Sequence, residues 1–343
     1  MTLEFHCTAA SPSCVHFELP VMQPGHSPTD HPLFAGSVYQ RAHFHPAKPK
    51  ELLMATTTVQ AGYEGDYVQR FQFFLQHSGE HTVMREFMDK VLPGEFARIG
   101  EGKSDLNFLG VGSGQGEMDS HMLNILQSKF PTTQIDAHIV EPSIALIENF
   151  KASVAKSPNL QKVPFAWNAV SCAEYEKQVK DTKDTKRFDF MNMIQMLYYM
   201  DDYAAAIKFF HSLLREKGRL MIIHEAAGSS WATLWSTFAK DLCTKSVTKY
   251  ISAADVKGKL DKLGLKYEEH SIPNTMDITE CFVEGSKLGA MLLDFMTDQD
   301  SFQKAYSPEM RAKILDLLRD KCSTEKNGRR LFDCSLTCFL IQA

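Results

Sequence analysis

The sequence predicts an α/β protein with a doubly wound, mostly parallel sheet, and three features of the chain indicate this fold class. An apolar run at 106–111 passes through alternating glycines into an amphipathic pattern at 117–130. A second apolar run, at 137–141, ends in an acid. Apolar runs and helical patterns then alternate as far as residue 225. Such alternation is typical of parallel strands joined by crossover helices.

The glycines between the first strand and its helix predict a ligand site. Gly112, Gly114 and Gly116 alternate there, so backbone N–H groups can approach a ligand closely. A dinucleotide site requires G-x-G-x-x-G, and Glu117 stands where that third glycine belongs. The spacing G-x-G-x-G is instead typical of S-adenosylmethionine (SAM) methyltransferases, although a purely structural turn would use the same glycines.

An acid at the end of the second strand supports that interpretation. Glu141 lies 25 residues beyond Gly116, slightly more than the roughly 20 typical of dinucleotide folds. A carboxylate at this strand tip accepts hydrogen bonds from ribose hydroxyls. The alternative is an ordinary loop acid, which the order strand, glycines, helix, strand and acid disfavours.

The composition is that of a soluble globular protein. The 343 residues are 44% hydrophobic and 23% charged, with a formal net charge of −5, and they suffice for one large or two modest domains. Nothing in this charge suggests nucleic acid as a partner, and no apolar run reaches the length of a membrane span. Eight cysteines without a CxxC pair fit reduced thiols better than disulfides or structural zinc. We therefore expect a cytoplasmic monomer.

Four segments are expected along the chain. Residues 1–60 are rich in proline and histidine without any periodicity, which predicts a poorly ordered extension. Residues 61–225 are expected to form the SAM-binding core with N-terminal lid helices. Residues 226–300 are expected to be mainly a substrate-binding lobe, and residues 301–343 a closing helix and strand.

Two helices are expected ahead of the glycine turn. In the first, Tyr67, Phe71 and Phe74 share one face, as core residues or as a lid over a substrate. The second is expected to run over about 79–91 and to end at the Leu-Pro-Gly break of 92–94.

The later elements follow from the same periodicities, with residues 278–296 left as mixed. Helices are expected at 142–156, 202–214, 229–241 and 307–319 and within 245–263, and strands at 163–167, 188–196, within 214–225, 265–271 and 331–341. The string HEAAG at 224–228 is a near miss for the zinc motif H-E-x-x-H. Gly228 replaces the second histidine and the string ends a strand, so no metal site is predicted.

Several motifs resemble the histamine N-methyltransferase family. The resemblance runs from about Gly62 to the end and is carried by HSGEHTVMREFMDKVLPG, GQGEMD, HIVEPS, FAWN, FDFMNMIQMLYYMDD and GSSWATLW. MIQMLYY and EFMDK are specific to that family, whereas the glycine turn is shared by SAM enzymes generally. The resemblance implies a class I SAM-dependent methyltransferase fold, with a seven-stranded sheet and a smaller substrate-binding lobe.

The resemblance also implies site residues, with SAM as methyl donor and no metal. The implied SAM contacts are Gly112, Gly114, Glu141, Leu146, Ser171, Cys172 and Ile194. The implied substrate residues are the polar Glu80, Gln195 and Tyr199 and the aromatic Tyr67, Phe71, Tyr198, Trp231, Trp235 and Phe295. The family often has glutamine at Leu146 and serine at Cys172, so those two contacts are expected to be weakened or altered here.

The departures from the family cluster at the substrate end. They are Cys334 for a substrate-binding asparagine, Glu225 for an apolar wall residue, Leu242 for an aromatic residue, Thr248 for a cysteine, and Lys245 and Lys249 in place of an acidic loop. The residues implied to bind the cofactor depart much less from the family pattern. These changes indicate a relative that methylates a related imidazole.

Two imidazole substrates compete, and both present a neutral ring nitrogen near physiological pH. In carnosine, Glu225 is expected to bind the amine and Lys245 or Lys249 the carboxylate, which favours carnosine over histamine. The alternative interpretation is that both lysines are solvated loop charges that do not bind the substrate. A SAM-binding protein without catalysis is the third alternative, and the retained polar substrate residues argue against it.

Deleting residues 1–53 is expected to leave methyl transfer nearly unchanged, because the family's start falls near Met54. Turnover by the full-length and truncated chains, measured with labelled SAM, tests this. A collapse of activity in the truncated chain would show that the extension is part of the fold.

Overall fold

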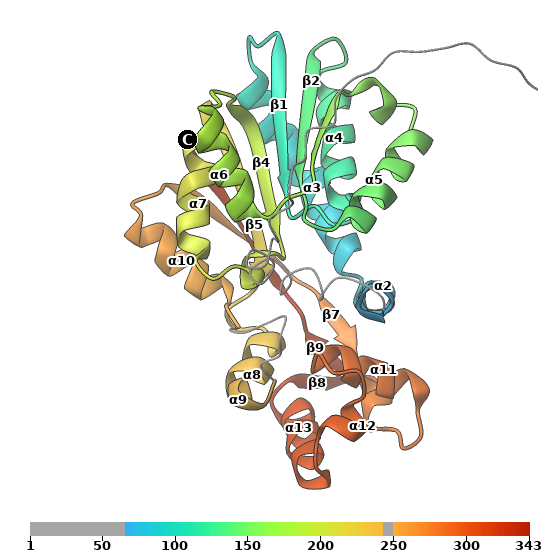
Figure 1. Ribbon diagram of the computed structural model, residues 1–343. Helices are drawn as coiled ribbons and strands as arrows, with labels where there is room; N and C mark the ends of the chain where they lie inside the picture. The colour runs from blue at the N-terminus through green and yellow to red at the C-terminus, as the bar shows by residue number, and fades with distance from the viewer. Residues whose placement is uncertain (1–65, 243–249) are drawn as a thin grey trace, which may run out of the picture. The chain divides into compact units, whose positions relative to one another are not determined.

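The computed structural model describes residues 66–242 and 250–343, with the backbone alone at 66–69. A seven-stranded sheet has the order β3-β2-β1-β4-β5-β10-β6 (Figure 1). Its strands are β1 Asp105–Val111, β2 Gln134–Val140, β3 Phe165–Asn168, β4 Phe188–Ile194, β5 Leu214–Glu225, β6 Tyr267–Ile272 and β10 Leu336–Gln342. Strands β1 to β5 are parallel, and β10 runs antiparallel to both β5 and β6. The predicted mostly parallel sheet is confirmed.

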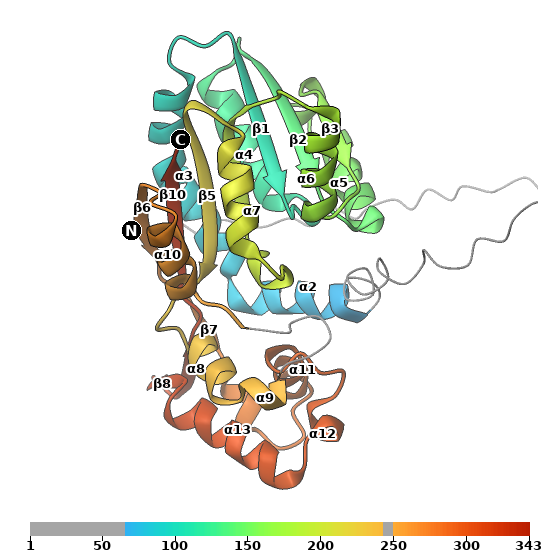
Figure 2. The same cartoon turned by 60° about the vertical axis from the view of Figure 1, so that its left-hand side comes forward.

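Helices cover both faces of this sheet (Figures 1 and 2). One face carries α3 (Glu80–Gly100), α4 (Glu117–Lys129) and α5 (Ile144–Lys156), and the other carries α6 (Cys172–Thr182), α7 (Tyr203–Ser212) and α10 (Ala253–Lys262). Six of the seven residues of β4 are consequently buried. Burial on both faces explains why the strand is apolar at every position except Asp189 and Asn192, which are buried as well.

The strand order reverses between β1 and β4. Strand β1 pairs with β2 on one side and with β4 on the other, so the helices that follow β1 and β4 leave toward opposite faces. A crevice opens at the carboxyl ends of the strands at such a reversal, and ligands bind there in open α/β sheets. The predicted glycine turn directly follows β1 at this point.

A second group of elements forms a lobe beyond the carboxyl ends of β4 and β5 (Figure 2). It contains α2 (Asp66–Ser78), α8 (Ser230–Thr237), α9 (Ala239–Leu242), α11 (Lys287–Met296), α12 (Phe302–Ala305), α13 (Pro308–Asp320), β7 (Thr275–Asp277), β8 (Ser323–Lys326) and β9 (Arg329–Asp333). The three strands form a small antiparallel sheet in the order β7-β9-β8. The apolar side chains of the lobe form one cluster of their own.

The predicted end of the second helix at 92–94 is wrong. Helix α3 continues through Pro93 and Gly94 to Gly100. Its buried side recurs as Met84, Met88, Leu92, Phe96 and Ile99, which pack on the sheet. The glycine is exposed and the proline partly exposed, so the missing hydrogen bond falls on the outer side of the helix, where water can replace it.

The single closing strand predicted at 331–341 is also wrong. Strand β9 ends at Asp333 in the small sheet, and β10 begins at Leu336 in the large one. Between them, Ser335 donates its backbone N–H to Asp333 Oδ1 at 2.9 Å, which turns the chain. One alternating segment thus supplies a strand to each of two sheets.

The sequence reasoning assigned no element to residues 172–182, where helix α6 lies. The helix begins with a capping box. Ser171 Oγ accepts a hydrogen bond from the Glu174 backbone N–H, and Glu174 Oε2 accepts one from the Ser171 backbone N–H at 2.8 Å. The spacing S-x-x-E was visible in the sequence. The expected helix at 229–241 is divided into α8 and α9.

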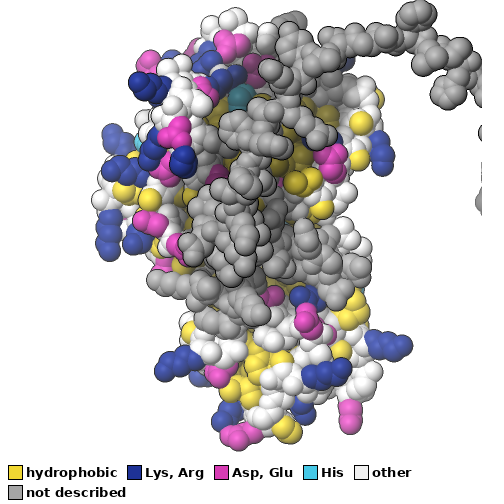
Figure 3. All heavy atoms as spheres, viewed as in Figure 1, with side chains coloured by type: hydrophobic (Ala, Val, Ile, Leu, Met, Phe, Trp, Pro, Cys, Tyr) yellow, Lys and Arg dark blue, Asp and Glu magenta, His cyan; other side chains and the backbone are white. Residues whose placement is uncertain are grey.

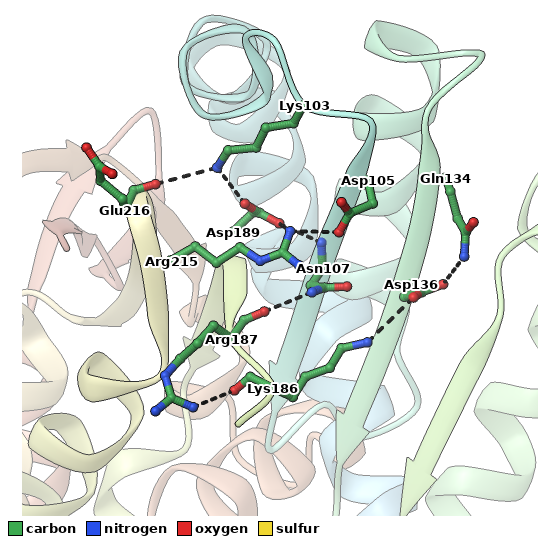
Figure 4. Close-up of polar contacts among 10 residues, drawn as sticks. All are labelled: Lys103, Asp105, Asn107, Gln134, Asp136, Lys186, Arg187, Asp189, Arg215 and Glu216. Carbon is green, nitrogen blue, oxygen red and sulfur yellow. Dashed lines mark hydrogen bonds and ion pairs between the residues drawn. The ribbon is translucent and has the colours of Figure 1, made fainter. Parts of the chain in front are cut away.

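A network of charged side chains around the buried Asp189 fastens the end of the sheet that lies away from the glycine turn (Figure 4). Asp189, in β4, is 1% exposed and accepts from Lys103 Nζ at 2.6 Å, from Arg215 Nη1 at 3.0 Å and from the Asn107 N–H at 2.7 Å. Arg215 also contacts Asp105 Oδ2 at 2.8 Å. Strands β1, β4 and β5 are thereby joined where they begin.

Charges on the described surface are mixed in sign. On the face drawn in Figure 3, the described basic and acidic side chains are interspersed rather than gathered by sign. Among the described residues, no helix combines the length and apolar character needed to cross a membrane.

Replacing Asp189 by alanine is expected to lower the free energy of unfolding by about 3 kcal/mol, because two cations and one buried N–H lose their acceptor. Asp189→Asn keeps an acceptor for the Asn107 N–H and should cost less. Urea denaturation measures both. Lys177→Ala, which removes a solvent-exposed pair with Asp181, is the control and should change little. Equal behaviour of all three variants would show that the network is not stabilising.

Candidate functional site

A cavity of about 540 Å³ opens at the strand reversal. All seven residues predicted to contact the cofactor line it, namely Gly112, Gly114, Glu141, Leu146, Ser171, Cys172 and Ile194. Its size is that of a site for a ligand as large as a nucleoside derivative. The structure therefore brings this predicted set together, and the roles of its members stay predictions.

The glycine turn is tightly packed at two of its positions. Gly112 has φ +67°, and a Cβ there would lie 2.9 Å from the Met196 side chain. Gly116 has φ +77°, and a Cβ there would lie 2.2 Å from the Phe150 ring. Only glycine combines this backbone conformation with these contacts.

Glu141 follows β2 and lies against the glycine turn. Its Oε2 accepts from the Gly114 N–H and its Oε1 from the Ser143 N–H, both at 2.9 Å. Burial raises the pKa of the carboxyl, and these two hydrogen bonds oppose that shift. Each oxygen retains a lone pair, so the carboxylate can still accept from two neighbouring ligand hydroxyls.

Sequence reasoning missed a buried polar pair on the cavity wall. Asn192 donates its side-chain N–H to Asp119 Oδ1 at 2.9 Å, and burial raises the pKa of Asp119 to about 6. The acid was visible in GQGEMD, but only the fold places it opposite Asn192 of β4. Gly110 of β1 leaves room for it, since a Cβ there would lie 2.1 Å from Asp119 Oδ1.

A second, smaller pocket of about 110 Å³ lies between the sheet and the lobe. Nine of the predicted substrate residues line it, namely Phe71, Glu80, Gln195, Tyr198, Tyr199, Glu225, Trp231, Trp235 and Phe295. Gln195, Tyr198 and Tyr199 follow β4, Glu225 ends β5, and the others come from α2, α3, α8 and α11. The pocket thus combines Glu80 and Glu225 from the sheet side with rings from both the sheet side and the lobe.

The rings of this aromatic pocket pack directly on one another. The ring of Phe295 stacks on that of Phe74, with 4.3 Å between the ring centroids. It packs edge to face with the ring of Trp231, with 6.2 Å between the centroids. Tyr198 and Tyr199 meet edge to face at 4.4 Å. Aromatic faces exclude water and attract cations.

Glu80, Glu225 and the amide of Gln195 form a polar group on the sheet side of the pocket, and Asp298 lines the lobe side. Gln195 donates Nε2–H to Glu225 Oε1 at 3.2 Å. Burial, with the negative charge of Glu225, raises the pKa of Glu80 to about 8, and a hydrogen bond from Gln195 opposes the rise. At neutral pH Glu80 is therefore mostly protonated in the free pocket, and a bound cation would favour its ionised form.

Gln195 occupies a strained backbone position. Its φ is +49°, a conformation uncommon for residues other than glycine. A backbone hydrogen bond to the Ile223 carbonyl, at 3.0 Å, holds it there. Strain of this kind gathers at functional sites, and here it aims the amide at both acids.

Some predicted residues lie elsewhere. Cys334 is fully buried in the lobe cluster and is not on the wall of either cavity. Leu242 is buried in the same cluster. The side chain of Tyr67, and Lys245, Thr248 and Lys249 entirely, lie outside the described residues.

Other residues of the pocket were not predicted. Phe74, Tyr250 and Asp298 also line it, and His224 lies behind Glu225. Phe74 belonged to the aromatic stripe of the first helix and could have been found there. The other three had no motif to mark a site, since the string HEAAG suggested only a zinc site, which was rejected.

The two cavities share part of their walls. Phe71, Glu80, Gln195, Tyr198 and Tyr199 line both. A group at the end of one ligand can therefore meet an atom of a second ligand across this boundary. Within residues 66–242 and 250–343, no cluster of three or more histidine, cysteine or acidic side chains suits a metal ion.

Known proteins resemble this chain along most of its length. A family described as a methyltransferase domain matches residues 84–270. Histamine N-methyltransferase of Bos taurus is 41% identical over 278 residues, covering 81% of this chain and 95% of that protein. Carnosine N-methyltransferase 2 of Gallus gallus is 40% identical over 279 residues, which cover 81% of this chain and 87% of that protein. The crystal structure of the plantazolicin methyltransferase BpumL in complex with SAH covers 83% of this chain and 94% of its own, at 10% identity and a TM-score of 0.46.

Glu141→Ala is expected to weaken SAM binding by about 1–3 kcal/mol, the cost of leaving buried polar partners unpaired. Titration calorimetry of SAM onto the wild type and the variant measures the change. Glu141→Gln keeps one acceptor oxygen and should lose less. Unchanged SAM affinity in a folded Glu141→Ala variant would remove this residue from the ribose role.

Proposed function

Because this chain belongs to the histamine N-methyltransferase family, we propose that it transfers the methyl group of SAM to an imidazole nitrogen of carnosine, forming anserine. Its activity as a SAM-dependent N-methyltransferase with a class I fold follows from that membership. The choice of carnosine, and the residues that bind each reactant, are our inference.

The shared wall of the two cavities carries this inference. We assign the large cavity to SAM, with the Gly112–Gly116 turn and Glu141 holding its nucleoside and amino-acid parts. The aromatic pocket then receives the imidazole. Glu80, Gln195 and Tyr199 stand at the boundary where methyl carbon and ring nitrogen would meet.

The chemistry asks little of acid or base groups before transfer. A neutral imidazole nitrogen attacks the methyl carbon in line with the carbon–sulfur bond, and the bonding electron pair stays on sulfur. Positioning of the two reactants can therefore supply most of the rate.

Proton loss follows the transfer. The methylated ring is a cation until its other nitrogen releases a proton. When ionised, Glu80 can accept this proton, because burial raises the pKa of its carboxyl to about 8, close to the pKa of such a ring.

Glu225 is our reason for placing carnosine first. It adds a second carboxylate to a pocket that already holds Glu80, and its side chain is only 14% exposed. Carnosine carries its amine farther from the imidazole than histamine does, at the end of an amide-linked chain, and an ionised carboxylate binds such an amine through a charge-assisted hydrogen bond. Lys245 or Lys249 remains our candidate for its carboxylate.

Histamine is the second candidate. No lysine or arginine stands among the described residues that line the aromatic pocket, which suits a substrate with an amine and no carboxylate. The relative of Bos taurus has this activity by name.

Methyl transfer from labelled SAM to carnosine and to histamine, side by side at equal concentration, decides between them. We expect kcat/KM to favour carnosine about tenfold, the effect of one added charge-assisted contact of ~1.4 kcal/mol. A preference for histamine would replace the proposed substrate by the second candidate. SAM binding without turnover of any imidazole would favour a non-catalytic protein.

Glu225→Val should lower kcat/KM for carnosine about tenfold or more, and for histamine less, because it removes the group assigned to the carnosine amine. The same assay measures both substrates with wild type and variant. Unchanged SAM affinity is the control for folding. An equal loss on both substrates would defeat the assignment of Glu225 to that amine.

A further inference from the structure

His224 lies directly behind the acid that faces the aromatic pocket. It is the last residue but one of β5, and its side chain is fully buried. Its Nδ1 lies 2.6 Å from Glu225 Oε2 and 3.3 Å from Gln195 Oε1. Its Nε2 is buried with no hydrogen-bond partner among the described residues. Neither cavity has His224 on its wall.

These contacts assign the protonation state of the ring. Two acceptor oxygens converge on Nδ1, so Nδ1 carries a hydrogen. The Glu225 backbone N–H also points toward Nδ1 at 3.0 Å as a donor, a contact that would suit a bare Nδ1. The contact between Nδ1 and the carboxylate oxygen is shorter, at 2.6 Å, and requires a proton between those two atoms. A second hydrogen, on Nε2, would be a buried charged donor without a partner, which is costly. The ring is therefore neutral, with its hydrogen on Nδ1.

This arrangement holds Glu225 without cancelling its charge. Gln195 donates to one carboxylate oxygen at 3.2 Å and His224 to the other at 2.6 Å. Both donors are neutral, so neither cancels the charge of the carboxylate, which stays available to the pocket. A lysine or arginine in place of His224 would neutralise that charge.

We propose that His224 is a positioning residue of the substrate site, whose Nδ1 hydrogen holds Glu225 ionised and oriented toward the amine of the substrate. This rests on the proposed function, in which Glu225 binds that amine. It makes the buried dyad of His224 and Glu225 a determinant of specificity for imidazoles that carry an amine.

Two amide variants at position 224 test whether the Nδ1 hydrogen of His224 positions Glu225. The amide nitrogen of His224→Asn can stand where Nδ1 stands, whereas that of His224→Gln reaches toward the position of Nε2. Each variant of the full chain is titrated with carnosine and with N-acetylcarnosine, which lacks the charged amine, in the presence of saturating S-adenosylhomocysteine. No turnover is needed, and binding of S-adenosylhomocysteine reports folding.

For His224→Gln we expect carnosine affinity to fall about tenfold, as for a lost charge-assisted hydrogen bond, while N-acetylcarnosine changes less than about threefold. His224→Asn should stay within about threefold of wild type on both. In a Glu225→Gln background, His224→Gln should add almost nothing, since it acts through that carboxylate. Ile222→Val, two residues earlier in the same strand and on the wall of neither cavity, should alter neither ligand.

Equal losses in the Asn and Gln variants, equal losses on both ligands, or additive losses with Glu225→Gln would overturn the proposal. If His224→Gln does not fold, nitrogen-15 NMR of the wild-type histidines decides, and a hydrogen on Nε2 of His224 would overturn it. The same pattern seen with histamine and N-acetylhistamine, but without carnosine binding, would keep the role of His224 and reject the proposed substrate. No binding of any amine-bearing imidazole would reject both.

Discussion

Coverage of the large sheet on both faces is the constraint on which the rest of the structure depends. Six helices bury β1, β4 and β5 so completely that ligands have no access to the sheet faces. Within residues 66–242 and 250–343, the large cavity opens instead at the carboxyl edge, where the strand order reverses. The glycine turn after β1, Glu141 after β2, Gln195 after β4 and Glu225 at the end of β5 all lie at this edge, although they are far apart in the sequence.

The lobe turns that open edge into two connected cavities of different character. The larger one is lined by backbone groups and the held carboxylate of Glu141, and the smaller one by rings of the lobe around Glu80 and Glu225. Burying two acids together is costly unless one gives up its charge or a cation joins them. The pKa of Glu80 is raised for this reason, and a cationic substrate would lower the cost of ionising both acids.

Where the sequence reasoning was wrong, long-range packing overrode a local signal. Pro93 and Gly94 are strong local breakers, but the buried stripe of α3 continues past them, and its contacts with the sheet outweigh one missing hydrogen bond. The segment 331–341 alternates as one strand should. It divides at Ser335 because its two halves are paired with different sheets, which no local pattern records.

The sequence by itself determined the parallel sheet, the glycine turn and the acid that follows β2, because burial on both faces and a left-handed turn leave local marks in residue type. The family resemblance added nine of the twelve residues that line the aromatic pocket, and Leu146, Ser171, Cys172 and Ile194 in the large cavity. Only the tertiary structure decided that Cys334 lies off the pocket wall, that Phe74 and Tyr250 lie on it, and that His224 holds Glu225. These placements depend on how the lobe packs against the ends of β4 and β5, and contacts between distant segments leave no periodicity in the chain.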